Sequence, residues 1–291
     1  MGGIAVEFGS NPAHAWRGQD AVRQGAAMRQ KKPSVLTRLR ALTGVSGVSA
    51  RTCVPFAVLT GVHLAAQVGE SLGVPGAALV APVTKTLLMP ALGAVAAEGL
   101  LNAKRRTGRL PAWAPLVAVG LTFSWFGDLA LIAPDWFLAG VGLFGVAQVA
   151  YATTFARAGD ASRTAGRPAL AAPYVVWWVA LLGVFGATQG FTPMTGAIAV
   201  YGSLLGTMAF LANRVSPTAA VGAGLFVLSD SLIGLRGSGV DLPAHGFWVM
   251  STYLAAQWLI VRELVALAER RGSATPAGGE TGAAVVAASR D

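Results

Sequence analysis

The sequence predicts an all-α membrane protein that crosses the bilayer eight times and keeps both termini in the cytoplasm. Three observations lead to this prediction. Of the 291 residues, 54% are hydrophobic and only 12% are charged, whereas soluble domains are about 25% charged. The apolar residues form long runs, each close to the roughly 20 residues that a helix needs to cross a bilayer. Basic residues gather between alternate runs, as the positive-inside rule expects.

Three regions follow one another along the chain. Residues 1–51 are polar, basic and rich in glycine, without the apolar core of a signal peptide, so we expect a mostly disordered arm. Residues 52–270 form the predicted transmembrane domain, and residues 271–291 a second disordered tail. The expected crossings are residues 52–70, 75–97, 111–132, 136–158, 169–190, 194–215, 217–236 and 244–268.

The second crossing contains three prolines, Pro75, Pro82 and Pro90. Proline removes a backbone donor and interrupts a helix in water. In a membrane helix it is tolerated, because neighbouring helices can satisfy the carbonyl that it releases. We therefore keep this segment as a crossing.

The loops alternate in charge. Basic residues occupy the N-terminal arm, the loops after the second, fourth and sixth crossings, and the end of the last crossing. The intervening loops hold Glu70, Asp135 and Asp241, with Arg236 as the exception. Removing one crossing would scramble this alternation, so it supports eight crossings and cytoplasmic termini together.

Several classes of function are disfavoured by composition. The net charge of +9 lies in the loops rather than along one stripe, so we expect no nucleic-acid partner. Cys53 is the single cysteine and cannot form an internal disulfide. The three histidines are scattered and match no metal motif, so we expect neither a metal nor a cofactor.

Charged side chains inside the apolar runs are the candidate functional residues. Asp128 lies in LTFSWFGDLALI and Asp230 in GLFVLSDSLIGL. A charge within a membrane helix is costly and is retained for a partner or a function. Asp128, Asp230 and Lys85 fall at a similar depth in three crossings, toward the non-cytoplasmic face, and this predicts a shared polar pocket that opens there.

Uncharged polar residues extend this predicted pocket. Helical spacing places Ser124 on the face of Asp128, and likewise pairs Gln148 with Tyr151 and Tyr253 with Gln257. Ser229, directly before Asp230, is small enough to let another helix approach. The predicted pocket residues are Lys85, Ser124, Gln148, Tyr151, Ser229, Tyr253 and Gln257. Hydrogen bonding between helices, without a catalytic role, is the structural alternative for the glutamines and tyrosines.

Several motifs occur in a characteristic order: Lys85 entering an apolar helix, SWFGDLAL at 124–131, WFLAGVGLFGVAQVAY at 136–151, LFVLSDSLI at 225–233 and YLAAQWLI at 253–260. Together they resemble the YhhN family of eight-helix membrane proteins, which includes the mammalian lysoplasmalogenases. The resemblance covers about residues 54–262. The chain departs from the family at Thr86, where proline commonly follows the lysine, and at Gln148, where histidine is common.

The resemblance implies a membrane hydrolase that cleaves the vinyl ether bond of a lysoplasmalogen to a fatty aldehyde and a glycerophosphoalcohol. Its partners would be the lysophospholipid substrate and the membrane lipids. Hydrolysis of a vinyl ether requires a proton donor and a second group that activates water, and paired carboxyl groups in an apolar site suit both tasks. The sequence leaves open which aspartate takes which role, and our hypothesis is Asp230 as the acid and Asp128 as the base.

Two alternatives remain open at this point. The same pocket would also serve another lysolipid or alkenyl compound. Alternatively, Asp128 and Asp230 would relay protons or bind a cation in a small transporter or lipid-binding protein. Polar residues concentrated in one half of the membrane favour an enzyme over a conduit. The composition, rich in Ala, Gly and Arg, indicates a GC-rich bacterial gene, and we therefore expect the protein in the bacterial inner membrane.

Overall fold

The computed structural model describes residues 2, 45 and 47–273 of the chain. These residues contain eight α-helices, three short 3-10 helices and no strand, which confirms the predicted fold class. Most of the predicted arm (1–51) and tail (271–291) lies outside the described residues. The helices are α3 (Ala50–Ser71), α4 (Ala77–Thr107), α5 (Ala114–Ala130), α6 (Phe137–Ala158), α7 (Ala172–Gln189), α8 (Pro193–Ala212), α9 (Pro217–Gly237) and α10 (His245–Ser273).

The protein is an integral membrane protein by the length and composition of its helices. Six of the eight described helices, namely α3, α4 and α6 to α9, are long and apolar enough to cross a bilayer. The apolar helix α5 is shorter, with 17 residues. Helix α10 has 29 residues and carries Arg270 and Arg271 in its last turn. That α5 and α10 also cross the membrane, and that both termini are cytoplasmic, stay predictions.

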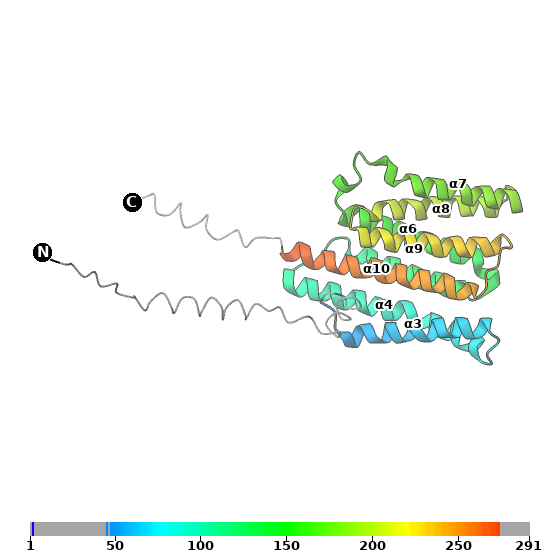
Figure 1. The fold of residues 1–291 in the computed structure, drawn as a ribbon, viewed down its shortest axis with the longest axis horizontal. Helices are drawn as coiled ribbons and strands as arrows, with labels where there is room; N and C mark the ends of the chain where they lie inside the picture. Colours follow the sequence, from blue (N-terminus) through cyan, green and yellow to red (C-terminus); the bar gives the residue numbers. More distant parts are fainter. Residues whose placement is uncertain (1, 3–44, 46, 274–291) are drawn as a thin grey trace. The chain divides into compact units, whose positions relative to one another are not determined.

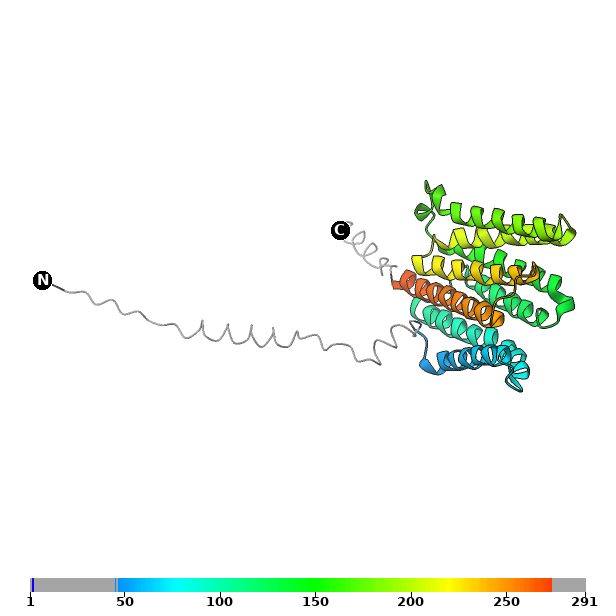
Figure 2. The same ribbon diagram turned by 45° about the vertical axis from the view of Figure 1, so that its right-hand side comes forward.

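The helices run side by side, with their axes close to parallel or antiparallel (Figures 1 and 2). Helix α10 packs against α3, α4 and α9, while α6 packs against α5 and α8. Helix α7 lies at one edge of the bundle and contacts mainly α8. The loops after α3, α5, α7 and α9 gather at one end, on the right in Figure 1, which we call the loop end.

The local sequence explains where helices α8 and α9 begin. Thr192 and Thr195 form a reciprocal capping box at the start of α8, and Ser216 accepts a hydrogen bond from Ala219 N–H at the start of α9. Pro193 and Pro217 follow these caps directly. Proline suits the first helical turn, because the N–H it lacks would have no intrahelical acceptor there.

Helix α4 continues through two of the prolines that interrupt the predicted second crossing, Pro82 and Pro90. Pro90 cannot donate to the carbonyl of Thr86, which lies four residues earlier. The indole Nε1 of Trp125 on α5 donates to that carbonyl instead, at 2.8 Å. A neighbouring helix thus supplies the donor that proline removes, as an apolar environment requires.

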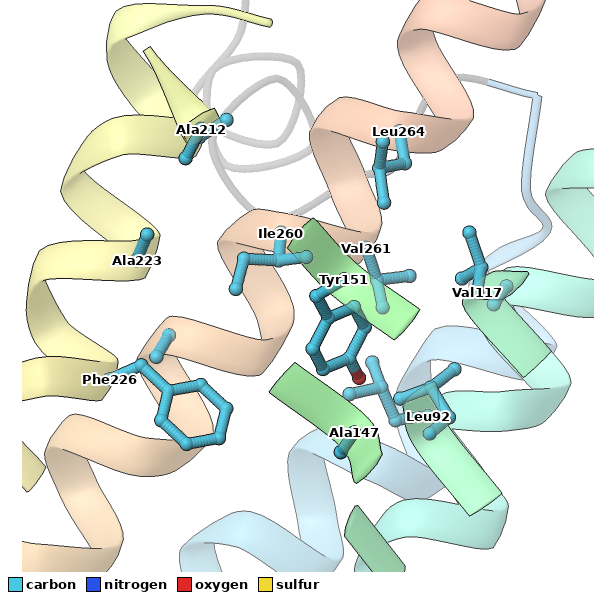
Figure 3. Close-up of a cluster of buried hydrophobic side chains, with 14 of the residues drawn as sticks. Leu92, Val117, Ala147, Tyr151, Ala212, Ala223, Phe226, Ile260, Val261 and Leu264 are labelled. Carbon is cyan, nitrogen blue, oxygen red and sulfur yellow. The ribbon is translucent and has the colours of Figure 1, made fainter. Parts of the chain in front are cut away.

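The core lies where α4, α6, α9 and α10 meet. Its largest fully buried side chains include Tyr151, Phe155, Phe226, Leu92 and Ile260. Figure 3 draws Tyr151 at the centre of this cluster, close to Leu92, Ile260 and Val261. Small residues let the helices approach closely here. A Cβ atom on Gly120 would lie 2.6 Å from the Tyr151 ring, for example.

The bond between Trp125 and Thr86 can be tested by a double-mutant cycle. Trp125→Phe should lower the free energy of unfolding by about 1–2 kcal/mol, because the carbonyl of Thr86 loses its donor in an apolar setting. In a Pro90→Ala background, the N–H restored at position 90 reaches the same carbonyl, so the loss should shrink. Thermal unfolding in detergent measures both values, and an equal loss in the two backgrounds would contradict this account.

The predicted orientation can be tested by labelling single cysteines. In a Cys53→Ser background, Ser238→Cys places a thiol at the loop end and Ser162→Cys places one at the opposite end. An impermeant maleimide added to intact cells should label position 238 and leave position 162 unlabelled until the membrane is permeabilised. The reverse pattern would overturn the assignment of the termini to the cytoplasm.

Candidate active site

Asp128 lies in a buried cluster formed by three helices. It is in the last turn of α5, with 3% of its surface exposed. The hydroxyl of Tyr253 on α10 donates to Asp128 Oδ2 at 2.9 Å. Lys85 Nζ on α4 lies 3.8 Å from Asp128 Oδ1 and forms an ion pair with it. The carboxylate therefore has both a hydrogen-bond donor and a counter-charge, which a buried charge requires.

A chain of hydrogen bonds extends from this cluster into the core. Tyr151 Oη on α6 donates to Gln257 Oε1 at 2.8 Å. Gln257 Nε2 donates to Ser124 Oγ at 3.0 Å and lies 3.3 Å from Tyr253 Oη, which it also reaches as a donor. The predicted helical pairs Ser124 with Asp128 and Tyr253 with Gln257 therefore face each other across α5 and α10. We call these four residues together with Lys85 and Tyr151 the Asp128 cluster.

Asp230 has a different set of partners. It lies on α9 and accepts a hydrogen bond at Oδ2 from Tyr201 Oη of α8. Gln148 Nε2 of α6 donates to the same tyrosine oxygen at 3.5 Å, the limit for a hydrogen bond. Gln148 Oε1 is buried and has no hydrogen-bond partner within the described residues. These three residues form the Asp230 cluster.

An apolar cavity of about 270 Å³ adjoins Asp230. Asp230, Tyr201 and Gln189 are its polar lining residues, and its other walls come from α6, α7, α8 and α9. The apolar side chains that enclose it include Phe144, Trp177, Leu181, Phe185 and Ile198. Asp230 therefore lies on the wall of a space that suits a hydrocarbon chain.

A second cavity of about 620 Å³ lies at the loop end and is more polar. Charged and polar residues from four helices line it, namely Gln67, Glu70, Lys85, Arg236 and His245. Leu131, Phe137, Ile233 and Gly237 line this polar cavity and the apolar cavity alike. The two cavities are therefore neighbours that share one wall.

The two carboxylate clusters lie near each other without a direct hydrogen bond between them. Leu131, three residues after Asp128, and Ile233, three residues after Asp230, both lie on the wall that the two cavities share. Phe144 lines the apolar cavity and packs edge-to-face on Tyr253, with 5.9 Å between the ring centroids. Asp128 lines neither cavity, whereas its partner Lys85 lines the polar one. The aspartates thus flank the region where the cavities meet.

Comparison with known proteins assigns the family. The sequence profile of the YhhN family matches residues 80–264, which include every residue of both clusters. The chain belongs to the YhhN family. A curated relative of this YhhN protein is lysoplasmalogenase TMEM86A of Bos taurus, 30% identical over 164 residues. The alignment covers 51% of this chain and 65% of the bovine protein. The matched part is thus just under two thirds of the relative's length. No solved structure matches the chain.

Most of the predicted pocket residues of this YhhN protein come together. Lys85, Ser124, Tyr151, Tyr253 and Gln257 join Asp128. Gln148 lies instead with Asp230, and its sequence neighbour on the same face, Tyr151, lies with Asp128. Helix α6 therefore connects the two clusters.

Ser229 lies outside the hydrogen bonds of both clusters. Its hydroxyl donates to the backbone carbonyl of Val249 on α10 at 3.1 Å, and the residue is 1% exposed. Ser229 therefore holds α9 against α10 and lines neither cavity. Within the described residues, no three His, Cys, Asp or Glu side chains are grouped as a metal site would require.

Tyr201 is the partner of Asp230 that the sequence analysis missed. It is the single phenol in the apolar run IAVYGSLLG, without a second polar residue of similar size on its face. The position of Tyr201 along its helix could have identified it as a partner of Asp230. Tyr201 lies about two turns inside the start of α8, and Asp230 lies about two turns before the end of α9. In antiparallel neighbours these positions are level with each other.

The Gln257 network predicts unequal effects of removing the two buried glutamines. Gln257→Leu should lower the free energy of unfolding by about 1–2 kcal/mol, because the hydroxyls of Tyr151 and Ser124 lose a buried partner. Gln148→Leu is the matched control and should cost less, since Gln148 makes one long hydrogen bond and has an unpartnered oxygen. Thermal unfolding in detergent ranks the two variants. A larger loss for Gln148→Leu would contradict the network.

Proposed function

We propose that this YhhN-family protein is a membrane hydrolase that cleaves the vinyl ether bond of a lysoplasmalogen. The products would be a fatty aldehyde and a glycerophosphoalcohol. The observation that carries the proposal is the position of Asp230 on an apolar cavity that shares a wall with a polar cavity, where the partner of Asp128 lies. The name of the bovine relative, a lysoplasmalogenase, supports the substrate class.

The shape of the site suits a lipid with a single chain. A lysoplasmalogen joins one hydrocarbon chain to a phosphorylated glycerol through a vinyl ether. In the proposed complex the chain occupies the apolar cavity and the head group occupies the polar one. The vinyl ether, which lies between chain and head group, then falls near the shared wall at Leu131, Phe137 and Ile233. Both carboxylate clusters are close to this wall.

The proposed reaction adds one water across the vinyl ether. The acid transfers a proton to the β-carbon of the double bond, and the positive charge that develops is shared between the α-carbon and the ether oxygen. Water attacks the α-carbon and loses a proton to the base, giving a hemiacetal. In the last step the hemiacetal hydroxyl gives its proton to the deprotonated acid, the bond to the glycerol oxygen breaks, and that oxygen takes the proton held by the base. The aldehyde leaves, and both carboxyl groups return to their starting forms. An oxocarbenium-like state of this kind is also met by carboxyl pairs in glycosidases.

The surroundings of the two aspartates support separate roles. Asp128 has Lys85 as a counter-charge and Tyr253 as a donor, and these favour the carboxylate form that a base needs. Asp230 lies beside an apolar cavity and accepts its hydrogen bond from the neutral hydroxyl of Tyr201. We therefore assign Asp230 as the acid and Asp128 as the base, with the two tyrosines holding the carboxyl groups in position.

A proton- or cation-coupled transporter is the alternative function. A conduit requires polar groups that continue toward the opposite face. The polar residues that line these two cavities lie near the loop end, whereas the other half of α10 contributes buried apolar residues such as Leu264, Val265 and Ala268. This asymmetry favours an enzyme. We also propose the bacterial inner membrane as its location.

The proposal predicts that both carboxylates are essential for turnover. Purified protein in detergent should release fatty aldehyde from a 1-alkenyl lysophospholipid and leave the matching 1-acyl lysophospholipid intact. Asp128→Asn and Asp230→Asn should each reduce aldehyde release at least about a hundredfold, because each removes a proton-transfer group. Mass spectrometry of aldehyde and glycerophosphoalcohol measures both products.

Asp135→Asn is the control for this experiment, because it makes the same chemical change at an exposed position outside the two clusters. It should retain full activity. Thermal unfolding of all three variants checks that they are folded. Aldehyde release by a folded Asp128→Asn or Asp230→Asn variant at the rate of the unchanged protein would overturn the paired-aspartate mechanism. Absence of aldehyde release by the unchanged protein would overturn the proposed activity.

A further inference from the structure

The polar cavity contains charged groups that the proposed reaction does not use. Lys85 belongs to the Asp128 cluster, but Arg236 and His245 take no part in the proton transfers described above. They come from the end of α9 and the start of α10, which meet at the loop end. Two cationic or hydrogen-donating side chains beside one cavity of about 620 Å³ indicate a site for an anion.

His245 has a buried nitrogen without a partner. The residue is 6% exposed and lines the polar cavity. Its Nδ1 accepts a hydrogen bond from Leu242 N–H at 3.4 Å and lies 3.3 Å from Asp241 Oδ1. Its Nε2 is buried and has no hydrogen-bond partner within the described residues. In the tautomer whose Nδ1 accepts from Leu242, Nε2 carries the hydrogen and is a buried donor without an acceptor, on a residue that lines the cavity.

The start of α10 adds further donors at the same place. His245 and Gly246 are the first residues of this helix, and both line the polar cavity. The N–H groups of a first helical turn have no intrahelical acceptors, and the helix dipole makes this end positive. In α10 those of Phe247 and Trp248 donate to the carbonyl of Ala244, which leaves the N–H groups of His245 and Gly246 as donors. Helix starts are for this reason common binding places for phosphate groups. The helix start and His245 Nε2 therefore favour the same kind of ligand.

Arg236 is held near this site by a weak ion pair. Its Nε lies 3.8 Å from Asp241 Oδ1, and both side chains are more than half exposed. Exposed ion pairs of this kind contribute little stability. The guanidinium is therefore able to turn toward a phosphate, with which it forms stronger, bidentate hydrogen bonds. Glu70, an exposed acid on the same cavity, supplies a negative charge for an ammonium group.

We propose that the polar cavity binds the phosphate head group of the lysolipid, with His245 Nε2, the guanidinium of Arg236 and the first N–H groups of α10 as donors. Glu70 pairs with the amine of a phosphoethanolamine or phosphocholine head group. This assignment rests on the proposed function for the identity of the lipid. The head-group site also determines the orientation in which the substrate binds, with the head group at the loop end and the hydrocarbon chain beside Asp230.

A binding experiment tests the head-group site without depending on turnover. The probes are 1-O-alkyl-glycerophosphoethanolamine, whose alkyl ether is not a vinyl ether, and 1-O-alkylglycerol, which lacks the phosphate. Tryptophan fluorescence or calorimetry in detergent gives the Kd of each. The unchanged protein should bind the phosphate-bearing probe at least about tenfold more tightly, since hydrogen bonds to a charged group are stronger than those to a neutral group.

Arg236→Gln and His245→Asn should each weaken binding of the phosphate-bearing probe about tenfold and leave 1-O-alkylglycerol unaffected. Asn keeps an amide near the position of Nδ1 but removes Nε2. Gln extends to the position of Nε2, so His245→Gln should recover much of the lost affinity. Arg157→Gln is the matched control, because it removes the same charge from an exposed position at the end of α6, opposite the loop end.

Glu70→Gln tests the amine contact. It should weaken binding of 1-O-alkyl-glycerophosphoethanolamine severalfold and leave 1-O-alkylglycerol 3-phosphate unchanged or bound more tightly. Equal affinity of the unchanged protein for probes with and without phosphate would overturn the head-group site. So would equal losses on both probes in Arg236→Gln and His245→Asn, since these would mark the two residues as structural.

The outcomes for the head-group site and for the proposed activity are separable. If the phosphate-bearing probe binds selectively but no aldehyde forms from a 1-alkenyl lysophospholipid, the head-group site stands and the hydrolase proposal fails. If aldehyde forms while the probes with and without phosphate bind with equal affinity, the hydrolase proposal stands and the head-group site fails. In the turnover assay the head-group variants should raise KM for the lysoplasmalogen and leave kcat within about twofold.

Discussion

Lipid cannot hydrogen-bond, and this constraint governs the whole protein. Any polar group within the hydrocarbon region must find its partner inside the protein. The backbone meets the requirement by forming helices, and where Pro90 removes a donor, the indole of Trp125 replaces it. The side chains meet it by converging. Hydroxyls, amides and carboxyls from α5, α6 and α10 therefore connect into one hydrogen-bond network, because the bilayer offers no alternative partner.

The two aspartates satisfy this constraint in different ways, and the difference carries the proposed chemistry. Asp128 is surrounded by partners, with a lysine and a tyrosine in contact with its two oxygens. Asp230 has Tyr201 on one oxygen and borders a cavity. A carboxyl group that is held by a counter-charge and another that faces an apolar space are suited to opposite proton-transfer roles. Both arrangements come from one fold and two similar sequence motifs.

The sequence predicted the helices closely, because lipid-crossing segments are recognised by length and hydrophobicity alone. It also identified the charged side chains that lie within the bundle, namely Lys85, Asp128 and Asp230. It could not predict their pairing in full. A membrane helix is apolar on every side, so its periodicity does not say which face turns inward. Gln148 and Tyr151 consequently joined different clusters, and Ser229 bonds to a backbone carbonyl. Tyr201 was missed because its partner comes from another helix.

The two cavities that adjoin the aspartate clusters lie toward the loop end, and this position limits how a ligand reaches them. Opposite the loop end, Arg271 donates to the carbonyl of Ala158 at 2.7 Å and Arg163 to that of Asn213 at 3.2 Å. These carbonyls end α6 and α8, so the arginines satisfy acceptors that the helices leave free. The core below them is tightly packed. Entry must therefore occur at the loop end or from the side. Helix α7 walls the apolar cavity yet has Phe185 as its single buried residue, so the side of the cavity borders the lipid from which a single-chain substrate would come.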